Sequence, residues 1–151
     1  MSMRGSCSCQ NISVEWKTID FGVVPRQCQC EYCKAKHASY ISKSGTSFKL
    51  RVKNESLHVV VRHGSGSADF HECKNCGDVV CVTAEIDGEI YGALNSQCME
   101  NKLGFTSAVE FDASGQSASE KLERWRQNWC HPVLITSPGC KAQAGATAAS
   151  A

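Results

Sequence analysis

No stretch of the sequence approaches the roughly 18 consecutive apolar residues that a membrane-spanning helix needs. The first ten residues are polar and lack the apolar centre of a secretory signal peptide. With 16 Lys and Arg against 15 acidic residues, the chain also lacks the basic excess that is typical of a dedicated nucleic-acid binder. We therefore expect a cytoplasmic protein that binds neither membranes nor nucleic acid.

Cysteine, in contrast, is abundant, with 11 among 151 residues. In a reducing cytoplasm, clustered cysteines are more often metal ligands or catalytic groups than disulfides, and an odd number cannot all pair within the chain. The length fits one domain with a core of its own. We expect that domain over residues 4–135. Residues 136–151 form a tail expected to be disordered or foreign to the natural protein, since Ala, Gly, Ser and Thr dominate its end.

The distribution of apolar residues predicts a mostly β protein. Alternating apolar and polar residues indicate half-buried strands, and short β-branched runs indicate buried ones. Together these patterns predict strands at residues 12–16, 48–52, 57–61, 79–82 and 105–111. The pair Asp87-Gly88 indicates a hairpin, because a two-residue turn needs positive φ and Asp-Gly tolerates it.

One helix is predicted near the C-terminal end. Ser117 and Glu120 have the spacing of a capping box ahead of a run rich in Glu, Lys and Arg. Leu122, Trp125 and Trp129 fall on one face at helical spacing. We interpret the two tryptophans as anchors of the helix in the core and not as a platform for a ligand.

Three clusters hold seven of the cysteines: Cys7 and Cys9; Cys28, Cys30 and Cys33; Cys73 and Cys76. The third cluster has the spacing of a zinc knuckle, in which a tight turn aims two sulfurs at one ion and Gly77 allows the backbone to close. Tetrahedral zinc takes four ligands, so two must come from elsewhere. Cys7 and Cys9 are candidates, because residues two apart on an extended strand point to the same side. Four thiolates would close the shell and make the site structural.

The second cluster, Cys28, Cys30 and Cys33, offers three ligands within six residues. Three protein ligands with one exchangeable position are the arrangement of a catalytic zinc. The fourth position can hold water, a substrate thiol or His37, although a histidine has other possible roles.

Two other interpretations of these clusters stay open. One is a purely structural zinc scaffold, and the other is a redox switch, since closely spaced thiols can also oxidise. Three thiols on a short loop suit a metal better than a single reversible bond. The other cysteines and histidines do not have the spacing of metal ligands; they are Cys81, Cys98, Cys130, Cys140, His58, His63, His71 and His131. Of these, Cys81 is expected to be a small buried apolar residue.

The three clusters stand in the segments Gly5-Ser6-Cys7-Ser8-Cys9-Gln10, Cys28-Gln29-Cys30-Glu31-Tyr32-Cys33 and Phe70-His71-Glu72-Cys73-Lys74-Asn75-Cys76-Gly77. In this order they resemble the motifs of the glutathione-dependent formaldehyde-activating family, which also includes centromere protein V. The resemblance covers about residues 4–135. A lone Cys-x-x-Cys would be weak evidence for this family, but three motifs in the family's order are highly specific for it.

The resemblance implies a tent-like, mostly β fold of small antiparallel sheets with one short C-terminal helix and two zinc sites. It implies a structural zinc on Cys7, Cys9, Cys73 and Cys76, and a labile, catalytic-type zinc on Cys28, Cys30 and Cys33. It also implies addition of glutathione to formaldehyde, giving S-hydroxymethylglutathione, and the reverse lyase reaction. Many members carry Ser-Gly or similar small residues where this chain has His37-Ala38.

Three functions are therefore considered. The first is a zinc-dependent carbon–sulfur lyase acting on a thiol–aldehyde adduct or thioether, with glutathione or a similar thiol as co-substrate. The second is a non-catalytic, zinc-stabilised binding module, and the third is a zinc-bound thiol sensor. Residues 34–62 contain seven Lys and Arg and one acid. This segment is either a solvated strand face or a site for the carboxylates of a glutathione-like substrate.

Overall fold

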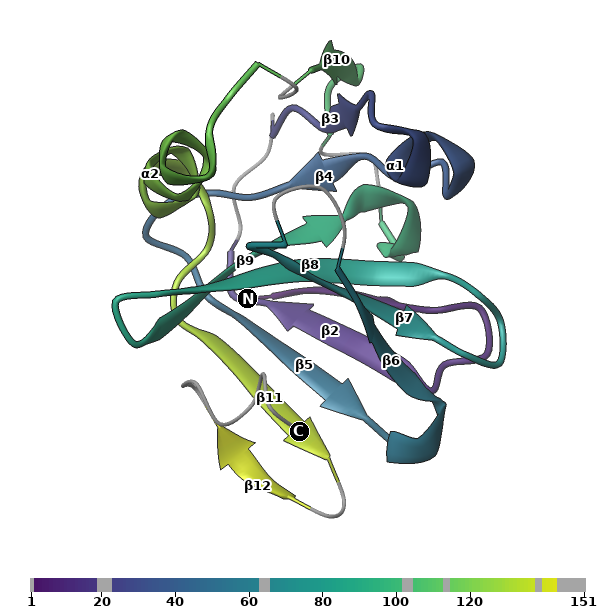
Figure 1. The fold of residues 1–151 in the computed structure, drawn as a ribbon. Helices are drawn as coiled ribbons and strands as arrows, with labels where there is room; N and C mark the ends of the chain where they lie inside the picture. The colour runs from purple at the N-terminus through teal and green to yellow at the C-terminus, as the bar shows by residue number, and fades with distance from the viewer. Residues whose placement is uncertain are drawn as a thin grey trace.

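The structure is a computed structural model that describes residues 2–18, 23–62, 66–101, 105–112 and 115–137, and the backbone of 140–143. The described chain is mostly β, as expected, and its strands form two sheets (Figure 1). The first sheet has the order β1 (Met3–Ser6), β2 (Ile12–Trp16), β5 (Phe48–Val52), β11 (Val133–Ser137) and β12 (Cys140–Gln143).

The second sheet has seven strands. Their order is β10 (Val109–Phe111), β3 (Arg26–Cys28), β4 (Tyr40–Ile41), β9 (Glu89–Asn95), β8 (Val79–Ile86), β7 (Asp69–Cys73) and β6 (His58–Val61). Pairing is mostly antiparallel, and β5–β11 and β3–β10 pair in parallel. In Figure 1 the long β8–β9 hairpin crosses the middle of the molecule, between β2 and β5 on one side and β3 and β4 on the other.

The main core lies between the first sheet and the β8–β9 hairpin. Along β2 and β5, buried residues alternate with more exposed ones, which confirms the predicted strands. Trp16 and Leu50 are fully buried, and Phe48 packs closely beside Gly92 of β9.

The hairpin turn also forms as predicted. Asp87 and Gly88 have φ of 54° and 82°, and Ile86 pairs with Glu89 across them. Two other expectations hold in part. The run at residues 57–61 does form β6, but its residues are only half-buried because β6 is an edge strand. Of residues 105–111, the strand covers only Val109–Phe111, while Phe105 makes a single bridge to Val23.

Helix α2 (Ala118–Asn128) confirms the predicted capping box at Ser117 and Glu120. Trp125 and Trp129 stack at 4.5 Å and are buried, so they anchor the helix as expected. They belong to a second apolar cluster, with Tyr40 among its members, that lies beneath α2. The sequence did not predict helix α1 (Glu31–Ala35) or the short 3-10 turns η1 (Glu55–Leu57) and η2 (Ser96–Cys98).

Strand pairing continues past residue 135, the domain end expected from the sequence, into β11 and β12. Residues 144–151 lie outside the described residues, so the division into domain and tail stays a prediction. In the part of the chain that the structure describes, no helix is long and apolar enough to cross a membrane.

Gly5 occupies a tight position where β1 passes the end of η2. It bridges to Met99, and a Cβ at Gly5 would lie 2.5 Å from the carbonyl oxygen of Cys98 and 2.8 Å from Sδ of Met99. The backbone at Cys98 cannot move aside as a flexible side chain can, so only glycine fits at position 5.

We predict that Gly5→Ala lowers the free energy of unfolding by about 1–3 kcal/mol, because the added methyl overpacks against backbone. Urea denaturation of the zinc-loaded protein measures this. Gly115→Ala is the control: no atom lies within 4 Å of its Cβ position, and we expect a change below about 0.5 kcal/mol. Equal stability of the two variants would contradict the packing argument.

Candidate metal centres

The first candidate centre brings together the sulfurs of four cysteines, Cys7, Cys9, Cys73 and Cys76, all within 4.8 Å of one another. The Sγ atoms of Cys7 and Cys9 are 3.8 Å apart, and those of Cys9 and Cys73 are 3.5 Å apart. Four sulfurs at about 2.3 Å from one tetrahedral zinc would be separated by roughly 3.8 Å. This all-thiol donor set therefore fits zinc, and the cluster can hold a metal ion.

The backbone reaches this arrangement by two turns. Around Cys73, the Gly77 amide donates to the Cys73 carbonyl at 2.7 Å, and Gly77 has φ of 79°. The N-terminal pair differs from expectation, because β1 ends at Ser6 and Cys7 does not lie on an extended strand. Instead, the Gln10 amide donates to the Cys7 carbonyl at 3.0 Å, so a turn aims the two sulfurs.

Polar contacts fix the two turns to each other. The carboxylate of Asp78 accepts hydrogen bonds from the amide and hydroxyl of Ser8, and these bonds lower the pKa of Asp78. Hydrogen bonds, the first from the side chain of Asn75, lower the pKa of the exposed Cys9 thiol to about 6. Burial raises the pKa of Cys7 to about 12. The Cys9 thiol is thus readily ionised, whereas ionisation of all four thiols of the cluster needs a cation.

The second candidate centre comprises Cys28 at the end of β3, Cys30 at the N-cap of α1, and Cys33 inside α1. Their sulfurs lie within 4.8 Å of one another, so this cluster too can hold a metal ion. The Cys33 amide donates to the Cys30 sulfur at 3.4 Å, as in an ordinary helix cap. A hydrogen bond with Cys28, followed by burial, raises the pKa of the Cys33 thiol.

His37 does not join the second cluster. It is exposed, and it lies in the left-handed region with φ of 54°, just after the C-cap residue of α1. Its amide donates to the Lys34 carbonyl at 3.2 Å and the Ala38 amide donates to the Cys33 carbonyl at 3.0 Å, as at the end of a helix. Glycine adopts this left-handed conformation most easily, so His37 occupies a position that is unusual for a residue with a side chain.

The remaining candidates lie apart from both clusters. Cys81 is fully buried in β8, as expected, and Cys98 and Cys130 belong to neither group. His71 is buried between Nε2 of His58, 2.9 Å away, and the hydroxyl of Thr83, 2.7 Å away. Burial lowers the pKa of His71 to about 3, so it serves as a neutral structural side chain. His131 lies against Glu89, and His63 and the side chain of Cys140 lie outside the described residues.

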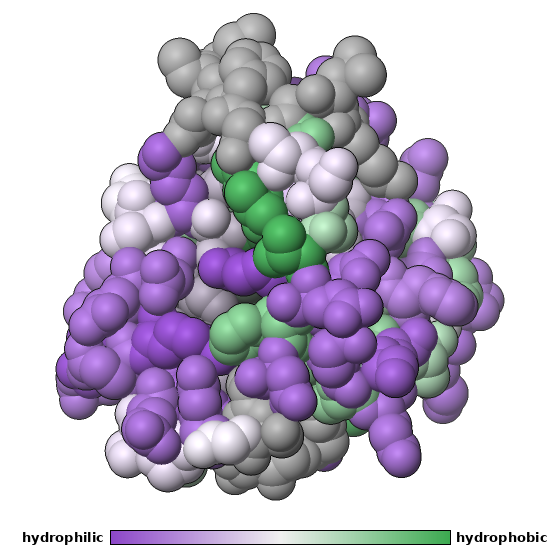
Figure 2. Space-filling model, turned by 90° about the horizontal axis from the view of Figure 1, so that it is seen from above, coloured by the Kyte–Doolittle hydropathy of each residue, from purple (hydrophilic) through white to green (hydrophobic). Residues whose placement is uncertain are grey.

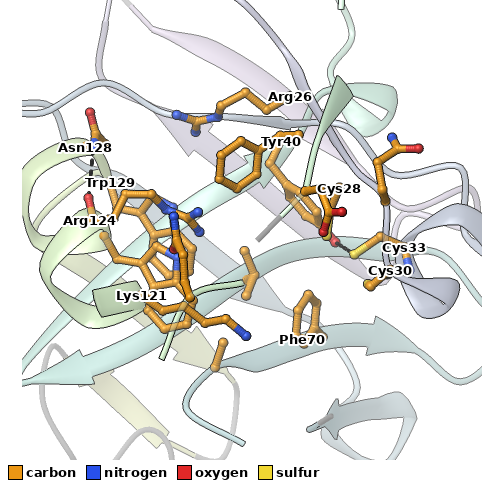
Figure 3. A pocket seen from close by; sticks show the side chains of 17 residues that line it. Arg26, Cys28, Cys30, Cys33, Tyr40, Phe70, Lys121, Arg124, Asn128 and Trp129 are labelled. Carbon is orange, nitrogen blue, oxygen red and sulfur yellow. Dashed lines mark hydrogen bonds between the residues drawn. The ribbon is translucent and has the colours of Figure 1, made fainter. Parts of the chain in front are cut away.

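A cavity of about 800 Å³ opens beside the second cluster, and all three of its cysteines line it. Figure 3 shows Cys28, Cys30 and Cys33 on one side of it, with Lys121, Arg124 and Trp129 of α2 opposite. The two tryptophans of α2 therefore line the cavity as well as anchoring the helix. Figure 2 views the molecule from above, where a short apolar strip lies among hydrophilic side chains.

The basic segment at residues 34–62 does not supply the cations of this cavity. Lys36 contacts Glu72 at 3.3 Å, and Arg62 pairs with Asp69 at 2.6 Å. Lys49, Arg51 and Lys53 line a separate groove of about 350 Å³ on the first sheet. The cations that do line the cavity are Arg26, Lys121 and Arg124, which the sequence analysis did not identify.

The sequence model of a protein family, described as glutathione-dependent formaldehyde-activating enzyme, matches residues 2–113. The chain belongs to this family. The resemblance of the three cysteine motifs is thereby confirmed, and membership supports an enzyme with a glutathione-related function at a general level. The match ends before α2, so Lys121 and Arg124 lie outside the part of the chain that carries the family's pattern.

No curated protein matches the chain. A crystal structure of a Rhodobacter sphaeroides protein from a structural genomics programme is similar to it, with 18% identity and a TM-score of 0.54. The alignment covers 71% of this chain and 100% of the other. At this identity the likeness concerns the fold alone.

Polar contacts join the family's second and third motifs. The hydroxyl of Tyr32, between Cys30 and Cys33, donates to the carboxylate of Glu72, the residue before Cys73. The ammonium of Lys36 lies 3.3 Å from the same carboxylate and donates to the Gly77 carbonyl at 2.8 Å. Burial, and to a smaller extent the hydrogen bond to Glu72, raises the pKa of Tyr32, so its hydroxyl stays protonated and can donate. Helix α1 is thus tied to the turn that carries Cys73 and Cys76.

We predict that the purified protein binds about two zinc ions per chain, measured by elemental analysis, because each cluster has a donor set that suits zinc. Cys76→Ser and Cys30→Ser should each bind about one ion fewer. Cys98→Ser, which removes a half-buried thiol outside both clusters, should keep both. Loss of metal in the Cys98 variant would show that the assignment of sulfurs is wrong.

We also predict that Tyr32→Phe weakens zinc binding at the second cluster about tenfold, since supporting hydrogen bonds commonly contribute that much to metal affinity. Competition with a chromogenic chelator measures the affinity of each site. Binding at the first cluster should be unchanged. An equal loss at both clusters would mean that Tyr32 stabilises the fold in general.

Proposed function

We propose that the chain is a zinc-dependent carbon–sulfur lyase that forms and cleaves the adduct between a thiol such as glutathione and an aldehyde such as formaldehyde. The observation that supports this most is the position of the second cluster. Three cysteines, and not four, face a cavity whose volume suits a small organic ligand. None of the four cysteines of the first cluster lines this cavity or the groove on the first sheet.

We accordingly assign different roles to the two clusters. Cys7, Cys9, Cys73 and Cys76 would form a closed, structural zinc site. Cys28, Cys30 and Cys33 would hold a second zinc with one exchangeable position. When bound, that zinc lowers the pKa of a coordinating thiol and polarises a carbonyl oxygen.

The reaction itself balances without any oxidant. The sulfur of the thiol forms a bond to the carbonyl carbon, and the electron pair of the C=O π bond moves to oxygen. The proton that leaves the thiol ends on that oxygen, giving a hydroxymethyl thioether from formaldehyde. The reverse reaction cleaves the carbon–sulfur bond and returns the proton to sulfur.

The chain's own residues would bind and orient the reactants. Tyr40 lines the cavity, and its hydroxyl lies 3.4 Å from the sulfur of Cys33. Burial raises its pKa well above the ordinary value, so it stays a neutral hydroxyl at the sulfur end of the cavity. The buried ring of Phe70 and the tryptophans of α2 form an apolar wall that limits access of water to the adduct.

The test measures, by NMR exchange spectroscopy, how fast glutathione and formaldehyde exchange with their adduct. We predict that the zinc-loaded protein accelerates this exchange and that Cys30→Ser abolishes the acceleration while leaving thermal stability nearly unchanged. Cys76→Ser should lower stability severely, because a structural site contributes directly to folding. Cys98→Ser is the control and should keep full activity.

Other outcomes separate the alternative functions. Zinc that is released by glutathione without any turnover would favour a thiol sensor. Zinc at both clusters that is indifferent to glutathione would favour a structural binding module. If Cys30→Ser unfolds the protein as severely as Cys76→Ser does, the division into structural and catalytic sites is wrong.

A further inference from the structure

Three cations line the cavity. Arg26 comes from β3, and Lys121 and Arg124 come from successive turns of α2 (Figure 3). Across the described parts of the chain, none of the three makes an ion pair. One acidic residue, Asp112, also lines the cavity, so the lining carries an excess of positive charge.

Arg124 is the most unusual of these side chains. Its guanidinium carbon lies 4.3 Å from the ring centroid of Phe111, which fixes the plane of the group. Its Nη1 atom is buried and has no hydrogen-bond partner among the described residues. Burial, followed by the charge of Arg26, lowers the pKa of Arg124. A desolvated donor without a partner is costly, so the position requires another explanation.

Arg26 presents a second guanidinium to the same space. It donates from Nη2 to the hydroxyl of Ser42 at 2.6 Å, a neutral partner that leaves its charge uncompensated. Two partly desolvated guanidinium groups in one cavity repel each other, and a carboxylate between them would relieve both the repulsion and the missing hydrogen bonds.

We propose that Arg26, Lys121 and Arg124 form the subsite for a carboxylate that the thiol or thioether ligand carries remote from its sulfur. The proposal rests on the proposed function for the sulfur end, because Cys28, Cys30 and Cys33 define where the sulfur lies. The stem of the ligand would lie along Phe70, Trp125 and Trp129, between the cysteines and the cations. Two of the three cations, Lys121 and Arg124, lie on α2, beyond the residues that match the family.

The experiment measures binding of S-methylglutathione to the zinc-loaded protein by calorimetry. Its blocked sulfur cannot turn over, so binding is observed apart from catalysis. Arg124→Gln should raise the Kd at least about tenfold, because a charged hydrogen-bond partner is lost. Arg124→Lys keeps the charge without the planar fork and should give an intermediate Kd. Arg26→Gln is an independent variant on another element and should also weaken binding.

The matched control is Arg126→Gln on the same helix. Arg126 pairs with Asp87 and Glu123 on the outer surface and does not line the cavity, so its loss should leave the Kd unchanged. The diethyl ester of S-methylglutathione lacks both carboxylates. It should bind the unaltered protein at least about tenfold more weakly, and its Kd should not respond to Arg124→Gln.

Each result decides the question. If Arg124→Gln and Arg26→Gln bind S-methylglutathione as tightly as Arg126→Gln does, or if the ester binds as tightly as the acid, the subsite does not exist. Failure of the unaltered protein to bind S-methylglutathione overturns the proposal as well. Binding that depends on Arg124 without any exchange of the formaldehyde adduct supports the subsite while rejecting the proposed reaction. Exchange whose KM and rate are both unchanged by Arg124→Gln supports the proposed reaction while rejecting the subsite.

Discussion

The convergence of four thiols from segments that lie far apart in the chain is the constraint on which the rest of the structure depends. Cys9 and Cys73 are separated by 64 residues, yet their sulfurs lie 3.5 Å apart. This contact fixes the N-terminal turn of the first sheet against the β7–β8 turn of the second. Because such close thiols cannot all ionise without a cation, the donor set is suited to a metal and poorly suited to an empty, charged cluster.

The first cluster also determines where the second one lies. Glu72 directly precedes Cys73, and its carboxylate holds both Tyr32 and Lys36 of the α1 region. Helix α1 has only five residues, too few to be stable without tertiary contacts. The position of Cys30 and Cys33 therefore depends on the turn around Cys73. The α2 side of the cavity is anchored by a pair of stacked tryptophans, which belong to the same buried cluster as Cys33 and Tyr40.

Sequence spacing could predict those features that are local. The Cys-x-x-Cys turn, the Asp87-Gly88 hairpin and the capping box at Ser117 each depend on neighbouring residues, and each forms as predicted. Features that depend on tertiary position were missed. The basic segment at residues 34–62 was interpreted as either a solvated strand face or an anion site. The cations of the cavity instead come from β3 and α2, because charge along the chain does not show which face a side chain occupies.

The position of His37 shows why the second cluster stays at three ligands. The backbone leaves α1 through the left-handed conformation at this residue, and the side chain ends exposed and outside the sulfur group. A fourth ligand from the same loop would require α1 to end differently, and the backbone would then follow a different path from α1 to Tyr40. If Cys28, Cys30 and Cys33 hold a zinc ion, as proposed, the geometry of this helix end leaves one coordination position for a ligand in the cavity. If the proposed function holds, that ligand is the sulfur of the substrate, and the specificity of the enzyme is decided at the cationic wall across the cavity.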